Sequence, residues 1–488
     1  MKKSLRIISF VLVLLTVISM FAACGGTKPQ NGDESNNVAT TGGAEDNKAL
    51  PDMDWGGEQY RLLGREGSWA FQKNFEMAYE EMPQDVVGVA VWNRNIAIKD
   101  KYGLEVVAKF DSSPYNVAKI SLEAGDDLYD LVACSPELMH NLAEESYLVN
   151  LIGAPYINFE HETWNAYANE QLTMGGKLFY TTNKFLLQDK HRSWAMFYNR
   201  TMAREVNAGY FEDFVFDGTW TIDKLIELSK LGAKELDGAQ GMSMYDQFGM
   251  VLGDRYAFVQ ILYGMGFRLS EKGSNGYPKL VGTTDQILAM IDKAYELAKN
   301  VDVTFCDGVR MDPAENATET GLNIFYAGRG LVVAEAVSEL DNMDKIDFEF
   351  GILPNPKYNE NQENYYAIPN RSNGSLFGVP ATVENVDKAM FGLEAISEES
   401  VDTSYFEYIE TKCKLQDAYD EDAAKCLDII FDGVVYDIVF TSDIGGLGQL
   451  ASFTLIEQNA TAYTRLYDRM AKIANNEVKQ IKEIYEAQ

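Results

Sequence analysis

Short apolar runs alternate with amphipathic stretches from Trp55 onward, and this alternation restricts the possible folds more than any other feature of the chain. The runs and the helical segments that follow them are 60–64, 69–101, 104–110, 115–123, 129–134 and a helix that starts at 136. Gly103 is placed to end the first helix, and Ser135, Pro136 and Glu137 have the residue types of a helix start. Three strand–helix units in succession predict a parallel sheet in an α/β fold.

A second α/β unit is predicted to start at 176–187. Its helix begins near Thr219 or Thr221, either of which can cap the N-terminus. Further strands are expected over 193–199, 330–336 and 348–356, and further helices over 255–263 and 284–300. Residues 365–380 cross into another element, and the chain from 383 reads as mostly helical.

The loops after the first three strands are candidates for a binding site. They are residues 65–69, 111–113 and 134–137. Ligands of open parallel sheets bind beyond the carboxyl ends of the strands, where loops and helix N-termini present free N–H groups and side chains. The three loops are therefore expected to face the same side.

The chain opens with positive charges and an apolar run over 7–20, too short to span a bilayer comfortably but suited to an export signal. Residues 21–24, Phe-Ala-Ala-Cys, resemble the lipobox of bacterial lipoproteins, in which the cysteine is acylated before the signal is cut in front of it. The resemblance implies a signal peptide over 1–23 and a lipid on Cys24. An ordinary cleavage site beside an unrelated cysteine is the alternative.

Residues 27–50 carry almost no large apolar side chain, so they cannot bury enough surface to offset chain entropy. A flexible tether is predicted over 24–54. The composition is globular from Trp55 to Gln488, a length that favours two or three structural domains.

The charge and the rare residue types exclude several classes of function. With 42 basic and 74 acidic residues the net charge is −32, which argues against nucleic acid or anionic lipid as a partner. The cysteines after Cys24 match no zinc ribbon, and free thiols are favoured over a Cys413–Cys426 pair. Three histidines leave little material for a histidine-based metal site or a catalytic triad. We expect no metal and no cofactor.

Several fragments, in their order along the chain, resemble the extracellular solute-binding proteins of sugar ABC transporters, the family that includes maltodextrin-binding proteins. They are VWNRNIAIKDKYGLEVV, LEAGDDLYDLVACSPE, GKLFYTTN, MFYNRTM followed by WTIDKLIELSK, FYAGRGLVVAEA before FGILPNPK, and SNGSLFGVPATVENVDKAMFGLEAIS. The family in Gram-positive bacteria also uses an acylated cysteine. The likeness implies a binding protein rather than an enzyme, held by its lipid on the extracellular face of the cytoplasmic membrane, with a carbohydrate ligand and an ABC permease as partners.

The family fold is an α/β, two-lobed, type II periplasmic-binding-protein fold. Each lobe is a mainly parallel sheet flanked by helices, and ligand is held between the lobes, which close by hinge rotation. The resemblance implies an N-terminal lobe of 55–171 and 376–405, a C-terminal lobe of 172–366 and 406–488, and a hinge crossing at 367–375. Gly374 in that crossing is expected to absorb backbone rotation.

Sugar sites combine flat aromatic walls with carboxylates, amides and arginines that bind hydroxyl groups. The predicted ligand-binding residues are Arg65, Glu66, Trp69, Asp111, Ser135, Glu137, Arg192, Asp254, Tyr256, Glu335, Ser338 and Asn373. Trp69 and Tyr256 are the expected aromatic walls, each with a packing role as its alternative.

The resemblance also indicates what this site lacks. The stacking platform that the family carries after its GxxAM strand is replaced by Ala336-Val337-Ser338, which makes Tyr365 or Tyr366 the candidate for its role. The basic pair His191 and Arg192 stands where maltodextrin-binding members have an acid. It could favour a ligand with a carboxylate, and a surface salt bridge is the alternative.

Two other functions stay open from the sequence alone. One is a secreted carbohydrate-active enzyme with two carboxylates in a cleft, although 74 acids make any carboxylate pair easy to imagine. The other is a surface adhesin lipoprotein. Ligand-induced closure without turnover separates a transport binding protein from both.

Overall fold

The structure is a computed structural model that describes residues 49–66, 73–238, 240–253, 255–306, 317–457 and 460–488. Several predicted features lie outside these residues: the signal peptide over 1–23, Cys24, most of the tether, and the site residues Trp69 and Asp254. Residues 47–488 form one unit by their contacts. Within the described residues, no helix is both long enough and apolar enough to cross a membrane.

The first sheet has four strands in the order β11-β3-β1-β2. The strands are β1 (Glu58–Arg65), β2 (Leu104–Asp111), β3 (Leu131–Cys134) and β11 (Leu376–Gly378). β1 pairs in parallel with β2 and β3, which confirms the predicted parallel sheet, and the distant β11 adds an antiparallel edge.

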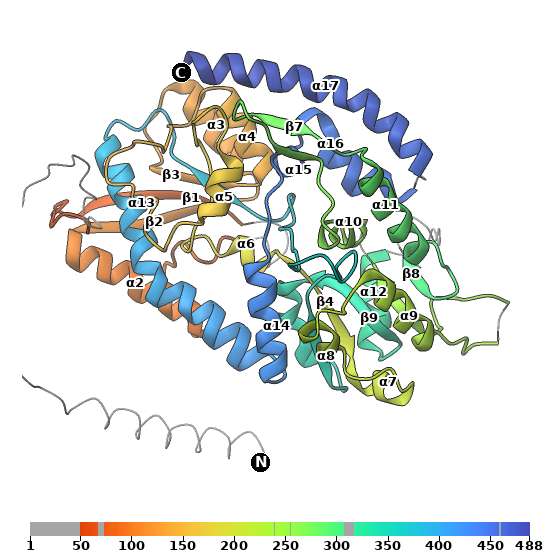
Figure 1. The fold of residues 1–488 in the computed structure, drawn as a ribbon. Helices are drawn as coiled ribbons and strands as arrows, with labels where there is room; N and C mark the ends of the chain where they lie inside the picture. The colour runs from red at the N-terminus through yellow and green to blue at the C-terminus, as the bar shows by residue number, and fades with distance from the viewer. Residues whose placement is uncertain (1–48, 67–72, 239, 254, 307–316, 458–459) are drawn as a thin grey trace, which may run out of the picture. The chain divides into compact units, whose positions relative to one another are not determined.

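Helices cover both faces of the first sheet (Figure 1). They are α2 (Val86–Tyr102) and α13 (Val386–Ser400) on one face, and α3 (Pro114–Ala124) and α4 (Pro136–Glu144) on the other. The alternation of side chains along β1 explains this, because Leu62 packs with the α2 and α13 core while Leu63 packs with the α3 and α4 core.

The helix predicted over 69–101 is wrong for residues 73–85, which are not helical. Asp85 caps α2 by accepting a hydrogen bond from the Gly88 N–H at 2.8 Å. Upstream, Asn74 is held against the end of β1, where its side chain accepts from the Arg65 N–H at 2.8 Å. The predicted end is confirmed, since Gly103 adopts φ 59° after the last turn.

The second sheet has five strands in the order β10-β4-β9-β5-β8. They are β4 (Trp194–Asn199), β5 (Phe248–Leu252), β8 (Thr304–Cys306), β9 (Gly330–Ala336) and β10 (Phe350–Leu353). β5 runs parallel to β8 and β9, whereas β4 runs antiparallel to β9 and β10. A separate hairpin joins β6 (Ser270–Lys272) and β7 (Pro278–Leu280).

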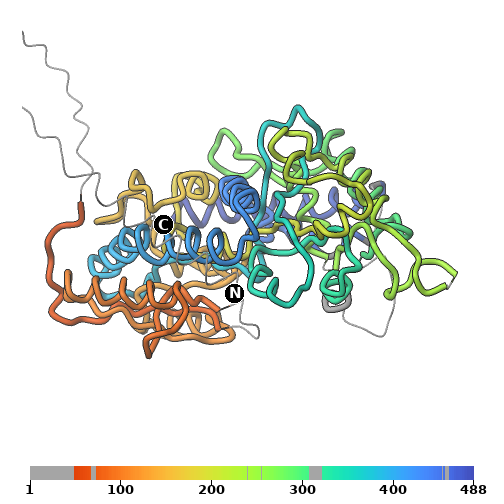
Figure 2. Tube along the Cα trace, turned by 90° about the horizontal axis from the view of Figure 1, so that it is seen from below, coloured from red at the N-terminus to blue at the C-terminus, as the bar shows by residue number. Residues whose placement is uncertain are grey.

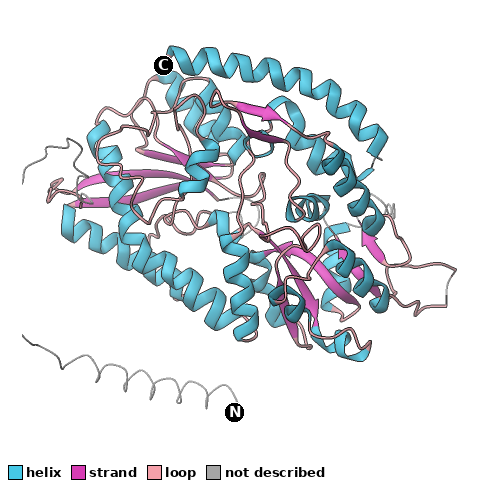
Figure 3. Ribbon diagram, in the orientation of Figure 1, coloured by secondary structure: helices cyan, strands magenta, loops and turns pink. Residues whose placement is uncertain are grey.

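Helices surround the second sheet (Figure 3). They are α7 (Arg200–Glu205), α8 (Phe211–Phe216), α9 (Ile222–Gly232), α10 (Arg255–Gly264), α11 (Asp285–Ala298), α12 (Ala317–Tyr326) and the 3₁₀ helix η2 (Val337–Lys345). Thr221, one of the two predicted caps, accepts from the Lys224 N–H and opens α9.

The segment 176–187 does not start the second sheet, contrary to prediction. It forms only isolated bridges, and one of them pairs Thr181 with Phe377 of the first sheet. Two of its polar side chains bond to other side chains: Thr181 donates to Asn169 at 2.6 Å, and Asn183 donates to Ser397 at 2.7 Å. Two short helices flank it, α5 (Ala166–Leu172) and α6 (Gln188–His191).

The C-terminal region is helical, as predicted, and its helices pack against elements of both the first and the second sheet and the helices around them (Figure 2). Beyond α13 it comprises the π-helical segments η3 (Val401–Tyr405) and η4 (Glu407–Asp417), then α14 (Glu421–Asp432), α15 (Ile438–Thr441), η5 (Ile444–Gly446), α16 (Leu447–Gln449), η6 (Leu450–Thr454), η7 (Leu455–Glu457) and α17 (Ala460–Ala487). α14 packs on β10, and α17 packs on α11 and on α4. The lobe assignment of 406–488 stays a prediction.

Three segments pass between the two sheets and hydrogen-bond side by side. The Asn370 N–H donates to the Arg192 carbonyl at 3.0 Å, and the Val435 N–H donates to the Ala367 carbonyl at 2.8 Å. The middle segment is the one expected at 367–375, and its neighbours are the chain before β4 and the chain after α14.

Candidate functional site

The carboxyl ends of β1 and β2 lie next to each other, as the strand pattern predicted. Arg65 is in register with Asp111, and the Glu66 N–H donates to the Asp111 carbonyl at 3.0 Å. The Asp111 carboxylate accepts from the Ser113 N–H at 2.8 Å, which shapes the loop before α3. Glu66 is exposed, while Arg65 and Asp111 are half-buried.

Arg65 reaches from the end of β1 to the crossing segment. Its Nη1 donates to the Ser372 carbonyl at 2.7 Å. Burial lowers the pKa of the guanidinium, and the neighbouring Cys134 at the end of β3 opposes that shift. Arg65 therefore connects the first sheet to the crossing segment at Ser372.

Ser135 and Glu137 lie at the start of α4, after β3. Ser135 occupies the N-cap position, but its side chain makes no capping hydrogen bond, and Pro136 follows it. Glu137 accepts a hydrogen bond from Arg371 Nη1 at 2.8 Å, with 41% of its side chain exposed. Both residues thus stand at the same edge as Arg65, and Glu137 also contacts the crossing segment.

Tyr256 reaches the same segment from the second lobe. Its hydroxyl lies 2.5 Å from Ser372 Oγ. Its ring stacks on Trp194, with centroids 6.4 Å apart and planes at 24°, and only 6% of the residue is exposed. Tyr256 therefore has the packing role, and its role as an aromatic wall for a ligand stays a prediction.

The crossing turn, defined here as residues 370–374, is a closed hydrogen-bonded turn. The Asn370 side chain accepts from the N–H groups of Ser372 and Asn373 at 3.0 and 3.1 Å. The Gly374 N–H donates to the Asn370 carbonyl at 2.7 Å, and a Cβ added at Gly374 would lie 2.9 Å from that oxygen. Gly374 is thus required by close backbone approach, and Asn373 sits in the turn itself.

Arg192, Ser338 and Glu335 gather where β9 ends and β4 begins. Arg192 Nη1 donates to the Ser338 hydroxyl. The half-buried Glu335 accepts from the Ala336 N–H at 3.2 Å. Just beyond, Tyr326 donates to Glu339, and burial raises the pKa of this carboxyl to about 7.

His191 does not join Arg192 in a basic pair. Its Nδ1 lies 3.0 Å from the Tyr408 hydroxyl, and its ring meets Phe75 edge-on at 5.3 Å. Burial, with the charges of Arg192 and Lys412, lowers its pKa far below the usual value, so the ring is neutral. Both His191 and Arg192 are buried, which also rules out the surface salt bridge.

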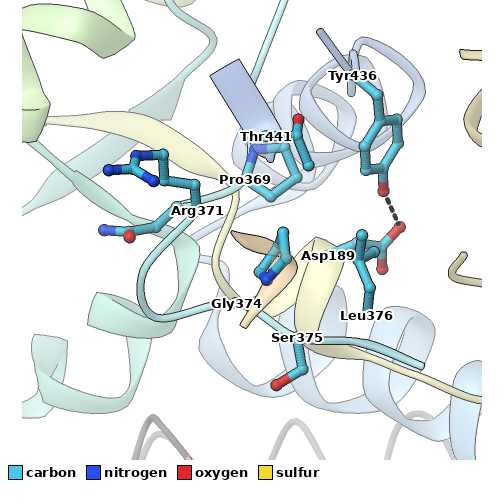
Figure 4. Close-up of a pocket in the computed structure, with 10 residues that line it drawn as sticks. Asp189, Pro369, Arg371, Gly374, Ser375, Leu376, Tyr436 and Thr441 are labelled. Atoms are coloured by element: carbon cyan, nitrogen blue, oxygen red, sulfur yellow. Dashed lines mark hydrogen bonds between the residues drawn. The ribbon is translucent and has the colours of Figure 1, made fainter. Parts of the chain in front are cut away.

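Two hollows lie near the crossing segments. The first lies between Asp189, Pro369 and Tyr436 and has a volume of about 10 Å³, enough for about one water molecule. Tyr436 donates a hydrogen bond to Asp189 across it at 3.2 Å (Figure 4). The second holds about 750 Å³ and includes Tyr365 and Tyr366 in its lining, but none of the ten predicted site residues that the structure describes. The tyrosines considered as a replacement platform thus face this second hollow.

Arg65, Glu137 and Tyr256 converge on the crossing turn, whereas Arg192, Glu335 and Ser338 lie together where β9 ends. Sequence reasoning missed Arg371 and Ser372, which make the contacts to Glu137, Arg65 and Tyr256. The sequence predicts a hinge over 367–375, and the polar composition of this tract is the signal that could mark it as part of the candidate site.

No protein-family profile matches the chain, and no curated protein sequence matches it. Solved structures do match. The maltose-binding periplasmic protein MalE from Listeria monocytogenes, in complex with maltose, has a TM-score of 0.55 at 13% identity over 87% of this chain and 98% of that one. An ABC substrate-binding protein from the same organism, in complex with cycloalternan, gives 0.53 at 11% over 85% and 98%.

A third similar structure is an ABC transporter solute-binding protein from Thermotoga lettingae bound with α-D-tagatose, with a TM-score of 0.51 at 15% identity over 87% of this chain and all of that one, 100%. At these identities the likeness establishes the fold. It is the two-lobed α/β fold of type II periplasmic binding proteins, with helices flanking each sheet, as the sequence resemblance implied.

Proposed function

We propose that the chain is a lipid-anchored substrate-binding protein that captures a carbohydrate between its lobes and delivers it to an ABC permease, without catalysing a reaction. The fold supports this, because the similar structures named above hold maltose, cycloalternan and tagatose. Anchoring through Cys24 would keep the protein beside its permease on the extracellular face of the cytoplasmic membrane.

The observation that carries the proposal is the convergence on the crossing turn. Arg65 comes from the first sheet and Tyr256 from the second, and both contact Ser372. Lobe rotation about the crossing segments changes the distance between these groups, so a ligand held by both favours one lobe arrangement over others.

The chemistry of the converging groups suits sugar hydroxyls. A guanidinium, the half-exposed carboxylate of Glu137 and the carboxamide of Asn373 offer donors and acceptors, and the Tyr256 hydroxyl lies beside Ser372. Arg65 is the cation best placed for an acidic sugar, because Arg192 is buried against Ser338. Monosaccharides, oligosaccharides and uronic acids are therefore the ligand classes to compare.

The test is a thermal-shift screen over these three classes, followed by calorimetry on each hit. We expect one class to raise Tm and to bind with one site per chain and micromolar or tighter affinity, about −8 kcal/mol. Small-angle scattering should show compaction when that ligand is added. Release of sugar from a glycan panel would overturn the proposal in favour of an enzyme, and binding without compaction would favour an adhesin.

Variants locate the site. Trp69→Ala and Tyr256→Ala should each weaken binding by about tenfold or more, since each removes an aromatic contact. Tyr245→Ala is the matched control, because Tyr245 is 65% exposed and lies outside the proposed site. Unchanged affinity in both test variants, with circular dichroism intact, would refute this site.

The anchor has its own test. Wild-type protein expressed in a bacterial host should partition into detergent, and Cys24→Ser should shift it to the aqueous phase. Equal partitioning of the two would remove the lipid from the proposal while leaving the binding test unaffected.

A further inference from the structure

The C-terminal helix α17 packs against α4 of the first lobe at a cluster of three ionisable side chains. His140 and Glu144 are one helical turn apart on α4, and Glu477 comes from α17. The candidate ligand atoms of the three residues all lie within 4.8 Å of one another. This cluster is separate from the crossing turn and takes no part in the proposed capture of sugar.

His140 presents an unpartnered nitrogen to the two carboxylates. It is 1% exposed, and its Nδ1 lies 3.0 Å from the Tyr180 hydroxyl, which in turn lies 2.9 Å from Ser442 Oγ. Its Nε2 is buried without a hydrogen-bond partner and stands 3.7 Å from Glu144 Oε1. The Tyr180 contact orients the ring as outer hydrogen bonds orient metal-bound histidines.

The cluster has an excess of acceptors and lacks a cation. The atoms that could bind an ion are one imidazole nitrogen and two carboxylate oxygens. Within the part of the chain that the structure describes, no lysine or arginine forms an ion pair with Glu144 or Glu477.

The remaining contacts hold the carboxylates in place and leave room for a ligand. One oxygen of Glu477 accepts from the Gly445 N–H at 2.8 Å, which fixes the side chain from the loop before α16. Glu144 keeps 25% of its side chain exposed, so an ion can enter and water can complete its coordination.

We propose that His140, Glu144 and Glu477 bind one divalent transition-metal ion, for which zinc is the natural probe. One imidazole nitrogen and two carboxylate oxygens with an open, water-accessible position form a three-ligand set of the kind that zinc accepts. Ligand atoms around a tetrahedral zinc stand roughly 3.3 Å apart, so side-chain rotations that shorten the present separations complete the site. The ion supplies the positive charge that the cluster lacks.

The sequence led us to expect no metal, because three histidines are few for a histidine-based site. The site uses one, and its third ligand lies near the other end of the chain, on α17. A bound ion would fasten α17 to α4, whereas the other part of α17 packs on α11 beside the second sheet. Metal occupancy would thus set how firmly the C-terminal helix is attached to the first lobe.

The test is calorimetric titration of the full chain with zinc chloride after removal of metal by a chelator. We expect one high-affinity equivalent, and we expect Glu144→Gln and Glu477→Gln each to weaken it about 100-fold. Glu483→Gln is the matched control, because Glu483 is exposed on the same helix and outside the cluster. The control is needed because the net charge of −32 attracts cations without a site.

A second readout reports on the histidine directly. The chain has only 3 histidines, so long-range ¹H–¹⁵N spectra of the imidazoles can be assigned with His140→Gln. Zinc at one equivalent should shift Nε2 of His140 and leave the other two rings unchanged. Equal zinc affinity in all glutamate variants, or saturable binding without a shift at His140, would overturn the site.

Discussion

Replacing Arg371 by methionine is the sharpest test of how the crossing turn is held. The Arg371 side chain is 3% exposed, and it donates to Glu137 at 2.8 Å while lying 3.7 Å from Asp443. Arg371→Met keeps the aliphatic stem and removes the charge that both carboxylates share.

The expected loss combines two unequal contacts. Glu137 is 41% exposed, so solvent screens its pair and the pair contributes at most about 1 kcal/mol. Asp443 is 12% exposed, and burial already raises its pKa, so losing the nearby cation adds roughly 1–2 kcal/mol. Arg371 Nε is itself buried without a hydrogen-bond partner, and removing it returns part of the loss. The net destabilisation is about 2 kcal/mol.

Differential scanning fluorimetry or calorimetry measures the effect. The entropy of unfolding per residue makes 1 kcal/mol equal to roughly 1 °C in Tm when residues 47–488 unfold as one unit. Arg371→Met should therefore lower Tm by about 2 °C, Glu137→Gln by less than about 1 °C, and the double variant by less than their sum. A decrease in Arg371→Met no larger than in Glu137→Gln would refute the reasoning, because the buried Asp443 contact would then carry no energy.

Two further changes test burial elsewhere in the chain. The carboxylate of Glu394 accepts a hydrogen bond from Trp164, and burial, with the charge of Glu398, raises its pKa from 4.5 to about 8. The stability that this group contributes is present below pH 4.5 and is lost as the pH rises through 8, so Glu394→Gln should increase the free energy of unfolding at pH 8 by at most about 4 kcal/mol, or about 4 °C in Tm, and leave it unchanged at pH 4.5. A pH-independent difference in Tm would contradict this prediction. A Cβ on Gly445, at φ +65°, would lie 2.5 Å from α17, so Gly445→Ala should lower Tm by several degrees. The control is Gly125→Ala, where φ is +74° but the added Cβ meets open space, and it should lower Tm by only about 1 °C. Equal decreases in Tm would mean that α17 does not pack tightly against Gly445.

The parts of the fold that sequence predicted are those fixed by local chemistry. Gly103 ends α2 because that turn requires the left-handed backbone conformation, which glycine adopts without strain. Thr221 starts α9 because its hydroxyl accepts a hydrogen bond from an N–H group that has no partner within the helix. β5 and β8 were missed because short, fully buried strands read as apolar runs with no period. Residues 176–187 looked like a strand, but side-chain partners such as Asn169 replaced the ladder.

The candidate site could be predicted from the sequence where its residues lie at the ends of predicted strands. Arg65 and Asp111 end β1 and β2, Ser135 follows β3, and the carboxyl ends of these parallel strands meet at one edge. Arg371 and Ser372 were not predictable as site residues, because their partners lie far away in sequence and on both lobes. Such a convergence becomes visible only when the crossing segments are placed.

The position of α17 restricts how the lobes can move. Near its start, Tyr463 donates to the Gly282 carbonyl at 2.8 Å, beside α11. Near its end, Tyr485 packs edge-on against Phe179 at 4.6 Å, and Gln488 donates to Ser146 at 2.6 Å. Rotation of one lobe against the other strains one of these two attachments. The last turn is the one that yields first, because helix ends fray at the lowest free energy and the contact of Gln488 is exposed. The lobe closure proposed above therefore has to be small or has to release the end of α17 from the first lobe.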